Sequence, residues 1–172
     1  PARERNPSRV VRIPSSTTVL ILRWSLTVGS IAGTAIRIHI TFLLFLVWLG
    51  TVYYRQGGAE AAWQGIIFVV LIFLCVLLHE LGHVFAGRRY GVKTPYVTLW
   101  PFGGIASMER MPEKPREELI VALAGPAVNV AIAGALLLWL GSRFDPASLA
   151  KIEDPAISIA VKLAGFNIIL VL

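Results

Sequence analysis

Charged residues are scarce in this chain: Lys, Arg, Asp and Glu make up only 15% of its 172 residues, against roughly 25% in soluble domains. Hydrophobic residues make up 56%, and several long apolar runs hold much of this excess. These runs exclude an ordinary soluble domain and predict an integral membrane protein. Cysteine is also nearly absent, which excludes an internal disulfide. The single Cys75 lies in an apolar run, where we expect a small packing residue.

Acidic residues are the scarcer charge, since 16 Lys and Arg against 10 Asp and Glu give a net charge of +6. One basic group lies between Arg3 and Arg23 and another between Arg88 and Lys93, so both flank apolar runs. The positive-inside rule places both groups on the cytoplasmic side. No nucleic-acid-binding motif accompanies the charge, so we expect a lipid bilayer and no nucleic acid as partner.

The order of the apolar runs predicts an α-helical polytopic membrane protein with at least four transmembrane helices and short strands at the membrane surface. Residues 1–18 are expected to form a basic cytoplasmic tail and residues 19–172 the transmembrane domain. The helices are expected at about 40–54, 61–90, 117–140 and from 156 onward, with a polar loop over 55–60. The strands are expected within 19–40 and over Tyr96–Trp100, where Pro101–Gly104 then breaks the second one.

The second expected helix contains the run His79-Glu80-Leu81-Gly82-His83. Two His at i and i+4 share one helix face and suit joint ligation of a zinc ion, while Glu80 beside them suits a general base. At 1.5 Å per residue, His79 would lie about 24 Å into an apolar layer about 30 Å thick. Ionisable side chains at such depth are costly, so a chance cluster is the weaker interpretation.

Two His do not complete a catalytic zinc site, which usually has three protein ligands. The only other histidine, His39, is expected to be an interfacial residue. Asp145 and Asp154 belong to the opposite membrane side, and the Glu residues between Glu109 and Glu118 belong to a solvated loop. The apolar run that reaches Leu172 has no polar flank. We therefore expect a C-terminally incomplete domain whose third ligand lies beyond Leu172.

A second polar group at membrane depth is Asn129, in the run Gly125-Pro126-Ala127-Val128-Asn129. Its amide can donate a hydrogen bond to a substrate carbonyl or to an oxyanion. The alternative is a helix-packing site, because Gly125 and neighbouring alanines allow close approach of another helix.

Together with Leu99–Ala106, which includes Gly103 and Gly104, these two runs resemble the site-2 protease family of intramembrane zinc metalloproteases. The resemblance covers the chain from about Trp24 onward. It implies a zinc endopeptidase that cleaves transmembrane or membrane-proximal peptide bonds of substrate proteins, as in regulated intramembrane proteolysis. It implies His79 and His83 as Zn²⁺ ligands, Glu80 as catalytic base, and Asn129, Gly103 and Gly104 as substrate-binding residues.

The chain departs from the family pattern at Asn167, which begins no Asn-Pro…Asp-Gly motif. The Asp of that motif, the family's third ligand, is expected beyond Leu172. The local sequence is similar to microbial members, some of which carry CBS-type regulatory domains, and it implies a multi-pass protein of a prokaryotic cell membrane. The alternative function is a catalytically silent, protease-like scaffold that binds client segments. A di-iron oxygenase would need more His-rich motifs, and a transporter would need polar residues along several helices.

Overall fold

The computed structural model describes residues 24–110, 112–141, 144–147 and 158–171. The expected tail over residues 1–18 lies outside them. The elements are β1 (Ser25–Ile31), β2 (Thr34–His39), α2 (Ile40–Arg89), β3 (Tyr96–Trp100), β4 (Gly103–Ala106), α3 (Pro115–Leu140) and α4 (Ile159–Ile169). The predictions of strands within 19–40 and of a strand over Tyr96–Trp100 are therefore confirmed.

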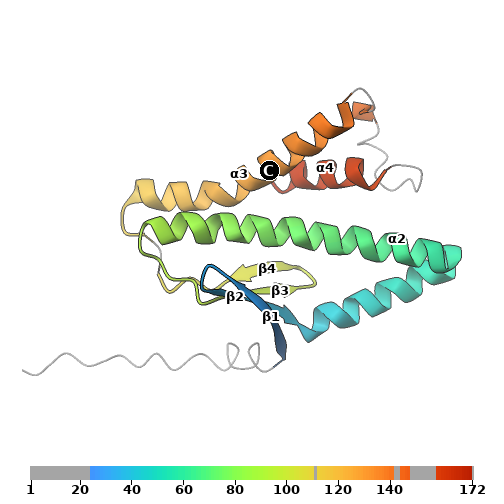
Figure 1. The fold of residues 1–172 in the computed structure, drawn as a ribbon, viewed down its shortest axis with the longest axis horizontal. Coiled ribbons are helices and arrows are strands. Elements are labelled where there is room, and N and C mark those ends of the chain that lie inside the picture. The colour runs from blue at the N-terminus through green and yellow to red at the C-terminus, as the bar shows by residue number, and fades with distance from the viewer. Residues whose placement is uncertain (1–23, 111, 142–143, 148–157, 172) are drawn as a thin grey trace, which may run out of the picture.

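Helix α2 is a hairpin of two arms, which we call the first arm (residues 40–56) and the second arm (residues 59–89). Its 50 residues are helical except at Gly57, with φ −153°, and Gly58, with φ 70° and ψ −159°. Figure 1 shows the chain doubling back at this point. A positive φ of this kind favours glycine. The expected six-residue loop over 55–60 is wrong, because its other residues are tolerated in helices and the reversal needs only the two glycines.

The four strands form one sheet in the order β1-β2-β3-β4. The pair β1–β2 is antiparallel, β2–β3 is parallel with Ile36 opposite Val97, and β3–β4 is antiparallel with Leu99 opposite Gly104. Strand β4 was not predicted, since Pro101–Gly104 was expected to end the extended segment. In the structure the break is a turn at Pro101 and Phe102, and the strand resumes at Gly103. This places β4 at the edge of the sheet.

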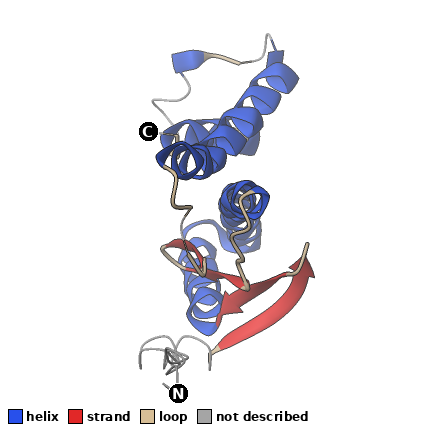
Figure 2. Ribbon diagram, turned by 90° about the vertical axis from the view of Figure 1, so that its left-hand side faces the viewer, coloured by secondary structure: helices blue, strands red, loops and turns tan. Residues whose placement is uncertain are grey.

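The second arm of α2 is the central layer of the molecule. Figures 1 and 2 show the sheet on one side of this arm and helices α3 and α4 on the other. On the sheet side, Leu81 and Val84 of the arm are buried against Ile36 and Val97. A second cluster joins Phe42 of the first arm to Phe73 of the second and to Leu99 of β3. Both arms are thus fixed to the sheet.

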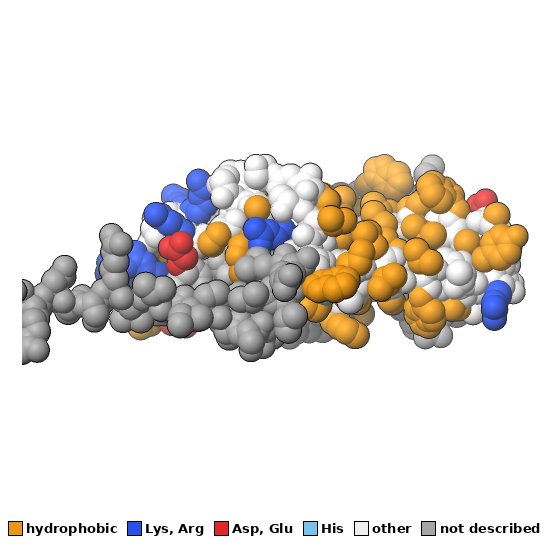
Figure 3. All heavy atoms as spheres, turned by 90° about the horizontal axis from the view of Figure 1, so that it is seen from below, with side chains coloured by type: hydrophobic (Ala, Val, Ile, Leu, Met, Phe, Trp, Pro, Cys, Tyr) orange, Lys and Arg blue, Asp and Glu red, His pale blue; other side chains and the backbone are white. Residues whose placement is uncertain are grey.

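Apolar side chains cover much of the outside of the helices. Leu44, Val47 and Trp48 recur at helical spacing along the first arm and are all exposed. Figure 3 shows hydrophobic side chains gathered over one half of the visible face and most Lys and Arg in the other half. Within the described residues, α2 and α3 are long and apolar enough to cross a membrane, whereas α4 is a shorter apolar helix. The expectation of an α-helical protein with short strands is confirmed at this level.

Candidate metal centre and the cavity beside it

The imidazoles of His79 and His83 converge on one side of the second arm. Their Nε2 atoms lie 3.0 Å apart, and the rings meet edge to face with centroids 4.7 Å apart. Two nitrogens bound to one tetrahedral zinc ion at 2.0–2.1 Å would be about 3.3 Å apart. The i and i+4 spacing therefore brings two suitable nitrogen ligands to almost the separation that one zinc ion requires.

Helix α3 contributes a partner to the other nitrogen of each ring. His83 Nδ1 lies 2.7 Å from the backbone oxygen of Val121, and His79 Nδ1 lies 2.9 Å from Asn129 Nδ2. Metal-binding imidazoles commonly use the second nitrogen in this way, which fixes the ring orientation. The donor set therefore fits a zinc ion, although the described residues contain no group of three His, Cys, Asp or Glu that could hold a metal.

His39 lies apart from this pair and has a structural place. It is buried, caps α2 by accepting a hydrogen bond from the Thr41 backbone N–H at 3.3 Å, and stacks on Trp100 with ring centroids 4.0 Å apart. His39 is the last residue of β2 and directly precedes α2, and its expected position at the membrane interface stays a prediction. Cys75 is buried, as expected for a packing residue.

Two glycines let α2 and α3 approach each other at the histidines. A Cβ at Gly125 would lie 2.2 Å from His83 Nε2 and 2.6 Å from His79 Nε2, so a side chain there would displace the rings. A Cβ at Gly82 would lie 2.7 Å from the backbone oxygen of Ala124. The Gly-Pro stretch was open to a packing or a site interpretation, and the structure supports both. Gly82 and Ala124 form the helix contact, while Gly125 leaves space beside the two nitrogens.

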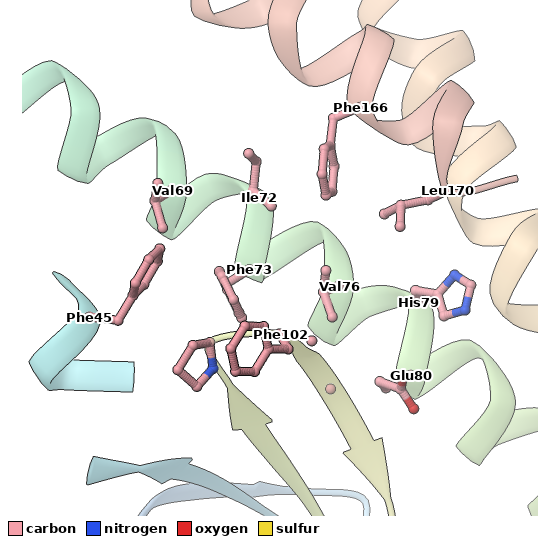
Figure 4. A pocket seen from close by; sticks show the side chains of 13 residues that line it. Phe45, Val69, Ile72, Phe73, Val76, His79, Glu80, Phe102, Phe166 and Leu170 are labelled. Carbon is pink, nitrogen blue, oxygen red and sulfur yellow. The ribbon is translucent and has the colours of Figure 1, made fainter. Parts of the chain in front are cut away.

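Glu80, one residue and so about 100° around the helix from His79, points toward the β3–β4 hairpin, as Figure 4 shows. A Cβ at Gly104 would lie 2.7 Å from Glu80 Cγ, so strand β4 runs directly against this side chain. The backbone of Ala106 also interacts with the Glu80 carboxyl group. Gly104, expected to bind substrate together with Gly103, is thus adjacent to the expected base, whereas Asn129 contacts a histidine instead.

A cavity of about 460 Å³ opens beside His79 and Glu80. The rest of its wall comes from both arms of α2, from the β3–β4 hairpin and from the C-terminal end of α4. It consists of two glycines and of apolar side chains: Phe45, Val69, Ile72, Phe73, Val76, Pro101, Phe102, Gly103, Gly104, Phe166 and Leu170 (Figure 4). Phe102, at the tip of the hairpin, is 100% exposed. The site therefore joins a polar His and Glu group to an apolar space that suits a hydrophobic segment.

Two histidines and a glutamate within a long apolar helix are residues that a membrane metalloprotease would use. The particular family follows from comparison with known proteins: residues 67–167 match the profile described as Peptidase family M50. Because this match covers more than half of the chain, the protein belongs to peptidase family M50, and the prediction of the site-2 protease family is confirmed.

Named relatives agree with this assignment. A zinc metalloprotease of Methanocaldococcus jannaschii is 36% identical over 124 residues, which are 72% of this chain and 34% of the relative. Rip3 of Mycobacterium tuberculosis is 31% identical over 163 residues, 87% of this chain and 39% of that protein. The solved site-2 protease from Methanocaldococcus jannaschii superposes with a TM-score of 0.64 at 33% identity, over 86% of this chain and 62% of that one. The chain thus spans between a third and two fifths of these curated relatives.

Proposed function

We propose that this chain carries the metal-binding and proton-transfer residues of an intramembrane zinc endopeptidase, which cleaves transmembrane or membrane-proximal peptide bonds of other proteins. One observation carries the proposal: the Nε2 atoms of His79 and His83 lie 3.0 Å apart, and Glu80, the residue after His79, faces an edge strand. The names of the relatives support zinc as the metal.

His79 and His83 would hold the zinc ion through their Nε2 atoms. The third ligand is expected to be an Asp beyond Leu172, as in the family pattern. When bound, zinc polarises the scissile carbonyl and makes water acidic enough to attack it at neutral pH. The remaining chemistry belongs to Glu80, whose carboxylate accepts a proton from the attacking water and passes it to the leaving amine nitrogen.

The substrate would bind as an extended strand along β4. A helical peptide bond is shielded by its own turn, so a transmembrane substrate must unwind before attack. An unpaired strand edge offers backbone hydrogen bonds to such a segment. Gly104 brings this edge against Glu80, and the apolar cavity beside it suits hydrophobic side chains.

The placement in the membrane is also part of the proposal. We infer a multi-pass protein of a prokaryotic cell membrane that crosses the bilayer four times: through the two arms of α2, through α3 and through the α4 segment. Arg88 and Arg89 at the C-terminal end of α2 would face the cytoplasm, together with the N-terminus. A CBS-type regulatory domain outside residues 1–172 remains a prediction.

The experiment is cleavage of a tagged model transmembrane substrate in detergent by the natural full-length protein that contains this chain. Glu80→Gln should lower the rate by about 100-fold or more, since general-base catalysis contributes about 10²–10⁴, and should leave zinc bound. A chelator should abolish cleavage. Glu60→Gln is the matched control, because Glu60 is exposed and contacts only Gln64 of its own helix, at 2.7 Å.

Three results would count against the proposal. Full activity of Glu80→Gln would remove the assigned base. Bound zinc without cleavage of several substrates would favour the client-binding scaffold. A wild-type protein that binds no zinc would overturn the metal assignment.

A further inference from the structure

A continuous series of close polar contacts links α3 to both histidines. Asn129 Nδ2 lies 2.9 Å from His79 Nδ1, His79 Nε2 lies 3.0 Å from His83 Nε2, and His83 Nδ1 lies 2.7 Å from the Val121 backbone oxygen. Asn129 is 0% exposed, and its Oδ1 has no hydrogen-bond partner within the described part of the chain. A buried amide oxygen left unpaired costs about 1–3 kcal/mol, so its position calls for a physical reason.

A histidine can bind a metal through Nε2 only when that nitrogen carries no proton, so the proton of the neutral ring must lie on Nδ1. His83 meets this requirement, because the Val121 backbone oxygen can only accept and therefore accepts from His83 Nδ1–H. His79 needs an acceptor at its Nδ1 in the same way.

The Asn129 amide is the group that lies against His79 Nδ1, at 2.9 Å. Its two ends have nearly the same shape, so a half-turn of the amide exchanges them and brings the unpaired Oδ1 to His79 Nδ1–H. The buried oxygen and the histidine proton then satisfy each other.

We propose that Asn129 is a positioning residue for the metal, whose Oδ1 accepts from His79 Nδ1–H and so holds His79 in the tautomer that presents Nε2. This inference rests on the proposed zinc function. The same turn pairs Oδ1 and releases Nδ2 from His79, which leaves the NH₂ group available to the substrate or oxyanion. Substrate contact and zinc affinity are then coupled through one side chain.

The oxygen of the amide is the end that holds His79. A leucine at position 129 has nearly the same size and can neither donate nor accept. An aspartate accepts from Nδ1–H but cannot donate. The two substitutions therefore separate the proposed role of Oδ1 from any role of Nδ2.

The test is zinc affinity of the full-length protein in detergent, measured by competition with a chromophoric chelator. Asn129→Leu should weaken zinc binding by about 10–100-fold, the usual effect of losing a partner behind a metal-binding histidine. Asn129→Asp should bind zinc at least as tightly as the wild type, while cleavage is lost if Nδ2 serves the oxyanion. Asn167→Leu is the matched control, because Asn167 is equally buried in α4 and its amide donates to Leu163 O of its own helix at 2.9 Å.

Unchanged zinc affinity in Asn129→Leu would overturn the inference, and so would Asn129→Asp binding as weakly as Asn129→Leu. Weakening in Asn167→Leu to the same degree would also overturn it, because the loss would then reflect burial of an asparagine in general. Absence of zinc binding in the wild type would be a separate failure, that of the proposed function.

Discussion

The two sides of the second arm of α2 differ in what they contact. On the α3 side, His79 and His83 have their Nδ1 atoms paired, and Gly82 and Gly125 bring the helices together with little space left. On the sheet side, Glu80 faces an edge strand and a cavity of about 460 Å³. We call these the closed side and the open side of the arm, and His79 lies at their boundary because it also lines the cavity.

The largest effect is expected from adding one methyl group to the closed side. Gly125→Ala would place a Cβ 2.2 Å from His83 Nε2 and displace both rings. Zinc affinity should fall by about 100-fold or more, at least the upper range for disturbing the surroundings of metal ligands, and proteolysis should be lost with it. Chelator competition measures the first and substrate cleavage the second.

The matched control for this change is Gly134→Ala, on the same helix, where a Cβ would meet nothing within 4 Å. It should bind zinc like the wild type. If the two alanine variants behaved alike, Gly125 would not be the residue that keeps space at the histidines.

The corresponding change on the open side is Gly104→Ala, whose Cβ would lie 2.7 Å from Glu80 Cγ. Cleavage should fall about 10–100-fold, because small displacements of a catalytic group are costly, whereas zinc affinity should stay within about twofold. Gly29→Ala in β1, with nothing within 4 Å of the added Cβ, is the control. Loss of zinc in Gly104→Ala would show that the two sides of the helix are not separable.

The smallest effect is expected from His39→Ala, which removes the cap of α2 and the stacking on Trp100. A lost cap costs about 1 kcal/mol, which lowers the melting temperature by roughly 2–4 °C in a domain of this size. His39→Asn should restore part of this loss, because Asn also caps helices. Thermal unfolding in detergent measures the shift, and a change in zinc affinity would contradict a purely structural place for His39.

The sequence predicted those parts of the site that are local in the chain. His79, Glu80 and His83 belong to one helical turn, so their spacing alone indicates which side chains point together. The partners of the two rings were not predictable in the same way. Val121 acts through a backbone oxygen, which no residue type signals, and Asn129 carries no mark of which of its two amide groups will be used.

The fold shows the same division. The reversal in α2 was expected at the right place but over too many residues, since polarity was taken for a loop where Arg55 and Glu60 remain helical. Strand β4 was missed because Gly103 and Gly104 disfavour strands when considered alone. The glycine at position 104 is explained by a long-range contact, because β4 approaches Glu80 there.

The parallel pairing of β2 with β3 also sets an order of assembly. The 50 residues of α2 separate these strands, so the sheet cannot be completed until both arms have been synthesised and have turned back at Gly57 and Gly58. At about 5–20 residues per second, this interval lasts on the order of several seconds. During that time the β1–β2 hairpin waits with one edge of β2 unpaired, and the edge against which the substrate would later be cut does not yet exist.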